Sequence, residues 1–328
     1  MRFLSRRDVE ALLDLDELVD AVADALVELS AGRTSMPPRT AAMVEERSGL
    51  LAVMPAYLPT AGVVSCKLVS LFPGNAGTGI PTHQALIAVF DPATGTPIAM
   101  MDGEHITASR TAAVSALATR LLAREDAEVL AIVGTGVQAR SHVRAVTRVR
   151  RFREVRVAGR TPGHVDALVS EEQHGLGVPP VAGAASVEAA LDGAHVVCVA
   201  THADSPVIDR AWLAPGAHVN SVGVNPGGPE VDVGTIRDAL VVVESRAAAL
   251  AEPPTGAMDL SGAVRQGILE PDAVAELGEV VSGTAVGRSS RDELTLYKGV
   301  GVAVEDAAAA ALALRRAGER GEGTEIGL

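Results

Sequence analysis

The chain has 328 residues, and 28 Lys and Arg stand against 41 Asp and Glu, which gives a net charge of −13 at pH 7. Hydrophobic residues make up 48% of it and aromatic residues only 2%. Affinity for nucleic acid comes largely from Lys and Arg that neutralise phosphates, and single strands also need aromatic side chains for stacking. The composition therefore excludes a general nucleic-acid-binding surface. The hydrophobic share also excludes a disordered chain.

We expect a cytoplasmic protein with no membrane partner, because no apolar run approaches the ~20 residues that span a bilayer. The first residues also show no apolar segment of a signal peptide. The two cysteines, Cys66 and Cys198, are far apart in the sequence, which suits a reducing compartment. They have no metal-ligand spacing, so we expect core positions and no metal site.

The first thirty residues predict helices. Ser5 is followed three residues later by Asp8, which resembles a capping box with Asp in place of the usual Glu. Apolar residues such as Leu18, Val22 and Leu26 then recur at helical spacing.

Strand patterns follow from about residue 49 to residue 103. The apolar runs 84–90 and 96–101 flank Asp-Pro-Ala-Thr-Gly, a strong turn sequence, and so predict an antiparallel hairpin. A glycine-rich segment, residues 73–79, precedes this hairpin. Two interpretations of it remain open: a mobile loop over a ligand, or a long hairpin connection.

A helix over 106–124 introduces a second pattern, in which short apolar strands alternate with helices. We expect helices at 138–149, 162–169 and 185–191, and strands at 129–133, 155–158, 196–200, 219–222 and 240–243. Such alternation predicts a doubly wound parallel sheet with helices on both faces, a Rossmann-type α/β domain, behind an antiparallel β-rich domain. We place the boundaries at residues 1–113 and 114–301, with the C-terminal helix region, 302–328, returning to the first domain. Residues 318–328 are polar and glycine-rich, and we expect them to fray. The arginines of 144–156 are interpreted as a solvated helix face.

A dinucleotide fingerprint lies at the first of these strands. The strand Val129–Val133 runs directly into a G-x-G-x-x-A motif, and a helix follows. In this motif the first glycine makes the tight turn, the second lets the backbone approach a pyrophosphate, and the alanine permits close packing of helix on strand. The helix N-terminus then presents N–H groups to the phosphates. The motif residues are Gly134, Thr135, Gly136, Val137, Gln138 and Ala139.

The next strand distinguishes NADP(H) from NAD(H). An acidic residue at its end binds the ribose 2′-hydroxyl of NAD, whereas an arginine accommodates the 2′-phosphate of NADP. Here the strand ends in Gly159, Arg160 and Thr161, without a carboxylate. The sequence therefore favours NADP(H), with NAD(H) possible.

Several blocks of the sequence resemble the ornithine cyclodeaminase/μ-crystallin family over nearly the whole chain. They are residues 66–70, 72–75, 81–85, 101–103, 106–113, 134–139, 298–301 and 305–306. The resemblance implies a Rossmann domain for NAD(P)H, a second domain that binds substrate and forms a homodimer, and chemistry at the Cα–N bond of an amino or imino acid.

The resemblance also implies three cationic substrate residues, Arg39, Lys67 and Arg110, which together could hold a carboxylate. Lys67 lies in an apolar strand, where burial near other cations would lower its pKa and make it a proton donor. Arg110 follows closely on a helix start, where a cation opposes the helix dipole, and this favours a ligand role. Beyond the fingerprint, the implied cofactor contacts are Thr82, Arg110, Thr111, Thr201, Val222, Gly223 and Lys298.

Two departures from the family's cyclodeaminases distinguish between reactions. Asn225 stands where those enzymes carry a catalytic Asp, and Ala52 stands where they tend to carry a Glu. An amide cannot act as a carboxylate base, although it can hydrogen-bond a substrate nitrogen or water, so we assign Asn225 with Lys67 to the reaction centre. We predict NADP(H)-dependent reduction of a ketimine or cyclic imine carboxylate, or the reverse dehydrogenation of an L-amino acid. The alternatives are a cyclodeaminase with tightly bound NAD and a non-catalytic protein that binds NADPH or a small ligand.

Overall fold

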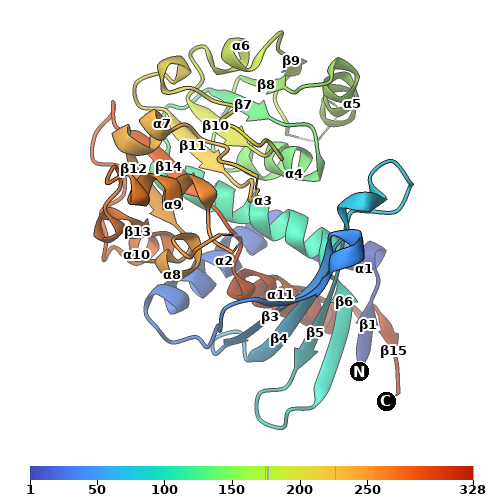
Figure 1. Ribbon diagram of the computed structural model, residues 1–328. Helices are drawn as coiled ribbons and strands as arrows, with labels where there is room; N and C mark the ends of the chain where they lie inside the picture. Colours follow the sequence, from blue (N-terminus) through green and yellow to red (C-terminus); the bar gives the residue numbers. More distant parts are fainter. Residues whose placement is uncertain (174, 176, 226, 254, 328) are drawn as a thin grey trace. The chain divides into compact units, whose positions relative to one another are not determined.

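A computed structural model describes every residue except 174, 176, 226, 254 and 328 (Figure 1). The chain divides into two compact units, which we call unit 1 (Met1–Arg110 with Val302–Leu328) and unit 2 (Thr111–Gly301). The division falls inside helix α3 (Gly103–Leu122), close to the boundary expected after residue 113. Each unit is described below by itself.

Unit 1 contains a seven-stranded sheet in the order β15-β1-β6-β5-β4-β3-β2. Its strands are β1 (Arg2–Leu4), β2 (Thr40–Val44), β3 (Gly49–Leu58), β4 (Val63–Leu71), β5 (His83–Phe90), β6 (Pro97–Asp102) and β15 (Thr324–Glu325). Its helices besides the start of α3 are α1 (Arg6–Leu12), α2 (Leu15–Ser30) and α11 (Ala303–Arg320), with 3-10 turns at Glu45–Arg47 and Pro73–Asn75.

The local predictions at the N-terminus and the hairpin are confirmed. Ser5 and Asp8 form a reciprocal capping box at the start of α1. Strands β5 and β6 pair antiparallel, and the Asp91 carboxylate accepts hydrogen bonds from the backbone N–H groups of Ala93 and Thr94 in the turn. The glycine-rich segment connects β4 to β5.

The sheet is antiparallel, as predicted, except where β1 pairs parallel with β6. The expectation that the C-terminal tail frays is wrong. The C-terminal helix ends at Arg320, and the tail after it does not fray at once. Its residues 324–325 form β15, which pairs with β1, and the N–H of Ile326 donates to the carbonyl of Met1. Backbone pairing thus orders a tail whose composition alone suggested a loose end.

The sheet of unit 1 has one covered face and one exposed face. Met54, Lys67, Ile87 and Met101 are paired across β3, β4, β5 and β6, so their side chains point to the same face, and all four are buried. Helix α11 packs against β3, β4 and β5 in this unit (Figure 1). Since a strand alternates its side chains, the neighbouring positions face the other way.

Unit 2 contains an eight-stranded sheet in the order β13-β12-β14-β11-β10-β7-β8-β9, and every neighbouring pair is parallel. Its strands are β7 (Val129–Val133), β8 (Glu154–Ala158), β9 (Val181–Gly183), β10 (Val196–Val199), β11 (His218–Ser221), β12 (Ala239–Val243), β13 (Ala275–Glu276) and β14 (Leu294–Lys298). Its helices are α4 (Val137–Val146), α5 (Pro162–Glu172), α6 (Val187–Leu191), α7 (Val233–Asp238), α8 (Arg246–Ala249), α9 (Met258–Arg265) and α10 (Leu277–Ser282), with 3-10 turns at Arg210–Trp212 and Pro271–Ala273. The predicted doubly wound α/β fold is confirmed.

The two faces of this parallel sheet carry different cores. One face packs apolar residues of β7, β10 and β14 against helices that include α6, α7 and α9. The other face is partly polar: the amide nitrogen of Asn220 in β11 donates to the hydroxyl of Thr119, and its amide oxygen accepts from Nε2 of His218. All three residues are fully buried. Cys198 also lies here, and burial raises the pKa of its thiol to about 12. Cys66, in unit 1, is half-buried.

Among the described residues, no helix combines the length and apolarity needed to cross a membrane.

Candidate active site

The glycine-rich turn after β7 has the geometry that a dinucleotide fingerprint requires. Gly134 has φ +122°, and a Cβ on it would lie 2.3 Å from the carbonyl oxygen of Ala200. Its N–H donates to the carbonyl of Ala158 at 2.9 Å, which joins the turn to β8. Gly136 is the N-cap of α4, and a Cβ on it would meet nothing within 4 Å. The first glycine is thus required by the fold, whereas the second leaves open space at the helix start.

This open space suits a phosphate. The N-cap residue of α4, Gly136, has no side chain that could accept a hydrogen bond, so it leaves the first N–H groups of the helix to another acceptor. Val137, at the first helical position, is 64% exposed, and the buried side-chain oxygen of Gln138 has no hydrogen-bond partner. Ala139 is fully buried, as close packing of helix on strand requires. The residues present therefore fit a dinucleotide pyrophosphate.

The end of β8 lies against the same turn. A Cβ on Gly159 would come within 2.6 Å of the side chain of Thr135, so Gly159 and Thr135 are close neighbours. Arg160 and Thr161 follow and are exposed, and Thr161 is the N-cap of α5. Their role in binding a ribose 2′-substituent stays a prediction.

The carboxyl ends of β10, β11 and β14 meet around a buried carboxylate that the sequence did not single out. Glu230 is 2% exposed. One of its oxygens accepts from the N–H and the hydroxyl of Thr201, both at 2.7 Å. The other accepts from the hydroxyl of Ser221 at 2.7 Å and from the N–H of Gly223 at 2.9 Å. Two predicted cofactor residues, Thr201 and Gly223, are thereby joined through Glu230.

Lys298 adjoins this carboxylate and is fully buried. Its ammonium donates to the carbonyl of Gly223 at 2.7 Å and to the hydroxyl of Ser221 at 2.9 Å, and it lies 2.8 Å from a carboxylate oxygen of Asp259. These three acceptors match the three N–H donors of an ammonium group. A direct contact between Lys298 and a cofactor stays a prediction.

Asn225 joins two loops of unit 2. Its amide nitrogen donates to the carbonyl of Ala203 at 2.6 Å and to the carboxylate of Asp204 at 2.9 Å, and its amide oxygen accepts from the N–H of Gly227. Val222 lies just before this loop and is half-buried. The structure thus shows what holds Asn225, while its assigned place at the reaction centre stays a prediction.

In unit 1, the two predicted cations Lys67 and Arg110 share an acidic partner. The Lys67 ammonium lies 2.7 Å from one oxygen of Asp306, and Arg110 Nε donates to the other oxygen at 3.1 Å. Arg110 Nη1 also donates to Glu305 at 2.7 Å. All four residues are at most 5% exposed. The buried cluster therefore sets two cations against two carboxylates.

Burial and the charges of this cluster set the pKa of Lys67. Burial lowers the pKa of Lys67 to about 8, and the charge of Arg110 lowers it too, while Asp306 opposes both. The helix dipole does not oppose the charge of Arg110 as expected, because α3 begins at Gly103 and the dipole acts only within the first turn. Glu305 and Asp306 of α11 supply the charge balance instead.

Three further predicted residues lie before β2, before β5 and within α3. Arg39 is half-buried and directly precedes β2, and Thr82 is half-buried before β5, with its hydroxyl 3.2 Å from Nδ1 of exposed His83. Thr111 follows Arg110 in α3 and is half-buried. Their predicted contacts with substrate or cofactor are not tested by the structure.

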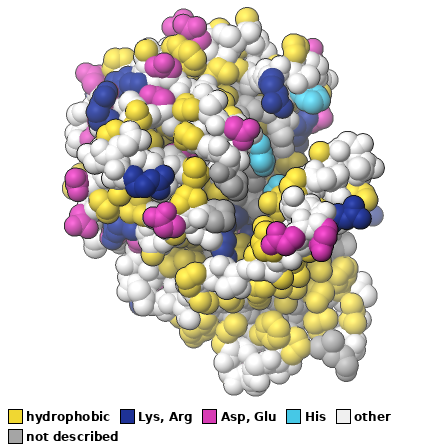
Figure 2. Space-filling view, viewed as in Figure 1, with side chains coloured by type: hydrophobic (Ala, Val, Ile, Leu, Met, Phe, Trp, Pro, Cys, Tyr) yellow, Lys and Arg dark blue, Asp and Glu magenta, His cyan; other side chains and the backbone are white. Residues whose placement is uncertain are grey.

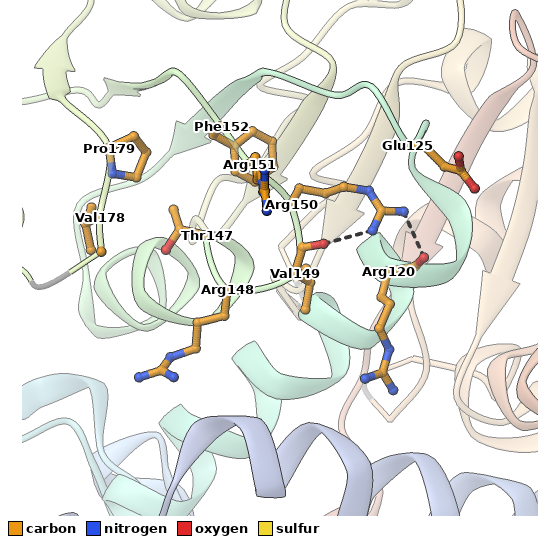
Figure 3. A pocket seen from close by; sticks show the side chains of 11 residues that line it. Arg120, Glu125, Thr147, Arg148, Val149, Arg150, Arg151, Phe152, Val178 and Pro179 are labelled. Atoms are coloured by element: carbon orange, nitrogen blue, oxygen red, sulfur yellow. Dashed lines mark hydrogen bonds between the residues drawn. The ribbon is translucent and has the colours of Figure 1, made fainter.

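A pocket of about 930 Å³ in unit 2 contains none of these residues (Figure 3). It is lined by Arg120, Glu125, Thr147, Arg148, Val149, Arg150, Arg151, Phe152, Gly177, Val178 and Pro179. These segments precede β7, β8 and β9, whereas ligands of open α/β sheets bind at the carboxyl ends of the strands. Figure 3 shows the Arg150 guanidinium turned to the carbonyls of Arg120 and Val149, which it binds at 2.9 and 2.8 Å. The pocket is therefore no candidate for the active site.

Comparison with known proteins identifies the family of this chain. The family model "Ornithine cyclodeaminase/mu-crystallin family" matches residues 1–320. The mouse ketimine reductase mu-crystallin is 40% identical over 315 residues, which cover 94% of this chain and 95% of that protein. The delta(1)-pyrroline-2-carboxylate reductase of Thermococcus litoralis, solved with NADH and L-proline, superposes with a TM-score of 0.93, at 37% identity over 99% of this chain and 100% of that one.

An archaeal alanine dehydrogenase, solved as a dimer with bound NAD, superposes with a TM-score of 0.90, at 30% identity over 100% of this chain and 99% of that one. The family that the sequence blocks resemble is thus confirmed. These relatives are reductases and dehydrogenases, as predicted. The chain belongs to the ornithine cyclodeaminase/mu-crystallin family, and it is an oxidoreductase of that family.

Proposed function

We propose that this protein uses NADPH to reduce a cyclic ketimine carboxylate, such as 1-pyrroline-2-carboxylate, to the corresponding L-amino acid, and catalyses the reverse reaction when the oxidised cofactor is in excess. The observation that carries the proposal is the buried cluster of Lys67, whose pKa is lowered to about 8. Support also comes from the relatives named as reductases of a ketimine and of pyrroline-2-carboxylate.

Reduction of C=N adds a hydride to the carbon and a proton to the nitrogen, and a bound reduced nicotinamide supplies the hydride. The Lys67 ammonium supplies the proton in this proposal. With a pKa of about 8, Lys67 is mostly protonated at pH 7, yet it gives up its proton more readily than an ordinary lysine. Asp306, 2.7 Å from the ammonium, keeps the charged form available in a buried site.

The substrate carboxylate is assigned to Arg39 and Arg110. A guanidinium can bind a carboxylate through two parallel N–H donors, which fixes orientation as well as position. The ion pairs of Arg110 with Glu305 and Asp306 hold its guanidinium in one orientation before any substrate binds. Pre-orientation of this kind lowers the entropic cost of bringing the imine carbon to the hydride donor.

NADPH is preferred to NADH in this proposal because Arg160 follows the end of β8 beside the fingerprint turn. An exposed arginine there can pair with a 2′-phosphate, and residues 159–161 contain no carboxylate to bind a 2′-hydroxyl. The pyrophosphate is assigned to the open space at Gly136.

We also propose that the protein is a homodimer in the cytoplasm. The face of the unit 1 sheet away from α11 exposes large apolar side chains, among them Leu51, Leu68 and Leu86, which are 37–44% exposed. Figure 2 shows hydrophobic side chains gathered over the region of this sheet. Exposed apolar patches of this kind mark interaction sites, and a second copy of the chain would cover it. The archaeal alanine dehydrogenase that the chain resembles is a dimer.

The experiment that tests the proposed reaction follows cofactor absorbance with NADPH and 1-pyrroline-2-carboxylate or 1-piperideine-2-carboxylate. Steady oxidation with formation of the cyclic L-amino acid supports it. Conversion of ornithine to proline and ammonia without net oxidation would show a cyclodeaminase instead. Tight NADPH binding with neither activity would show a binding protein.

A further inference from the structure

Glu230 connects two loops at the carboxyl edge of the unit 2 sheet. Four donors point at its two oxygens: two from Thr201, one from Ser221 and one from Gly223. Thr201 follows β10, and Gly223 follows β11, so the carboxylate holds the segments after two neighbouring strands. A Cβ on Gly223 would lie 2.5 Å from Glu230, so the loop approaches the carboxylate as closely as a backbone can.

Two further buried side chains hold Glu230 itself. Asp259 accepts from the N–H groups of Glu230 and Val231 at 2.6 and 2.8 Å. Lys298 lies between Asp259 and the Gly223 loop, and its ammonium binds the carbonyl of Gly223. The N–H of Gly223 thus binds Glu230, and its carbonyl binds Lys298. Both polar groups of one backbone unit are fixed by buried charges.

We propose that Glu230, with Lys298 and Asp259, is a positioning device for the nicotinamide half of the cofactor: it fixes the Thr201 and Gly223 segments against which that half binds. The inference rests on the proposed function. In a doubly wound sheet the dinucleotide crosses the carboxyl ends of the strands, with its pyrophosphate at the first βα turn. The adenosine half then lies towards β8, and the nicotinamide half lies on the other side of β7, over β10 and β11, where Glu230 acts.

The hydrogen-bond pattern makes Glu230 hard to replace even by an isosteric amide. Each carboxylate oxygen accepts from one backbone N–H, that of Thr201 or that of Gly223, and a backbone N–H can only donate. A glutamine has one oxygen and one NH₂, so one of these N–H groups would face another donor. A buried donor without an acceptor is costly, and the affected segment would move away. Glu230→Gln therefore disturbs one loop without removing volume from the core.

The experiment compares the whole cofactor with a fragment that lacks the nicotinamide. Dissociation constants are measured by calorimetry for NADPH and for 2′-phospho-ADP-ribose, with the intact wild-type protein, Glu230→Gln and the milder Ser221→Ala. We expect Glu230→Gln to weaken NADPH binding about tenfold, which corresponds to the loss of about one hydrogen bond's free energy, while the fragment constant changes less than twofold. Ser221→Ala removes one donor to Glu230 and should weaken NADPH binding about threefold, again without effect on the fragment.

The matched control is Glu172→Gln. Glu172 is also 2% exposed, but it lies at the end of α5 and binds Arg144 through its side chain. We expect this variant to lower the melting temperature and to change neither dissociation constant. If Glu230→Gln does not fold, Ser221→Ala tests the positioning role in its place. The quantity compared is again the dissociation constant for NADPH against that for 2′-phospho-ADP-ribose.

Three results would overturn the positioning role. Equal weakening of NADPH and the fragment would show a general loosening of unit 2, and unchanged binding of both would show that Glu230 serves stability alone. Failure of the wild-type protein to bind either NADPH or NADH would instead refute the proposed function, and the positioning role with it. Failure of reduction with NADPH binding intact would refute only the proposed reaction.

Discussion

In unit 1 the buried cations Lys67 and Arg110 face the buried carboxylates of Glu305 and Asp306, whereas in unit 2 the buried carboxylate of Glu230 faces backbone N–H groups and hydroxyls. The first arrangement leaves a group whose pKa of about 8 lies close to physiological pH. The second fixes the course of loops. We therefore assign proton transfer to the buried charges of unit 1 and backbone positioning to the buried carboxylate of unit 2.

The comparison predicts its largest effect at Lys67. Lys67→Met removes the proposed proton donor but keeps an apolar stem of similar length, so kcat for imine reduction should fall by about a thousandfold, within the usual range for loss of a general acid. NADPH binding should change by less than twofold, because its proposed binding residues lie largely in unit 2. Stopped-flow turnover and calorimetry measure the two quantities. A variant that keeps a tenth or more of its activity would remove Lys67 from the mechanism.

The next effect is expected at the adenosine end of unit 2. Arg160→Ala should weaken NADPH binding by roughly tenfold through the loss of a charge-assisted contact, and should leave NADH binding unchanged. Fluorescence titration with each cofactor measures both constants. Arg151→Ala is the matched control, because Arg151 is also exposed but lines the pocket at the opposite strand ends. Equal losses for NADPH and NADH would contradict the assignment of Arg160 to a 2′-phosphate.

A smaller effect should appear in the pH profile. Wild-type kcat/KM requires protonated Lys67, so it should decline as pH rises through about 8. Asp306 raises the pKa of Lys67, so Asp306→Asn should move this decline to lower pH. Glu305→Gln should move it less, because the influence of Glu305 on that pKa ranks below those of Asp306 and Arg110. A decline at the same pH in all three proteins would separate Lys67 from the titrating group.

The smallest effect is expected at the capping box of α1, which belongs neither to the Lys67 cluster nor to the Glu230 cluster. Ser5→Ala removes the two hydrogen bonds that the Ser5 hydroxyl makes with Asp8 and should lower the free energy of unfolding by about 1 kcal/mol. Steady-state turnover should not change. Urea denaturation measures the stability. A loss of turnover in this variant would show that unit 1 transmits distant strain to Lys67, and would weaken the local explanation of its reactivity.

Much of the fold could be predicted because its signals are local. The run Val129–Val133 is uniformly apolar and ends in glycine, and the structure gives β7 the same bounds. The strand β14 was not predicted, because Leu294–Lys298 is a short mixed sequence without a turn signal. Strands β1 and β15 have three and two residues, and only their pairing with each other and with β6 defines them.

The candidate site was predicted only in part, because its contacts join residues that are far apart in the sequence. Lys67 was predicted from the family resemblance and from its place in an apolar strand, but its partner Asp306 is far away in the sequence. Glu230 and Asp259 carry no motif at all. Their roles depend on contacts with Thr201, Gly223 and Lys298, which come together only in the folded sheet. A buried carboxylate surrounded by backbone donors cannot be read from sequence spacing.

The most direct test of the central claim is a single turnover assay with NADPH and 1-pyrroline-2-carboxylate, with the product analysed on a chiral column. We expect one L-proline to form for each NADPH oxidised. Release of ammonia without NADPH oxidation when ornithine is supplied, together with no reduction of the imine, would contradict it.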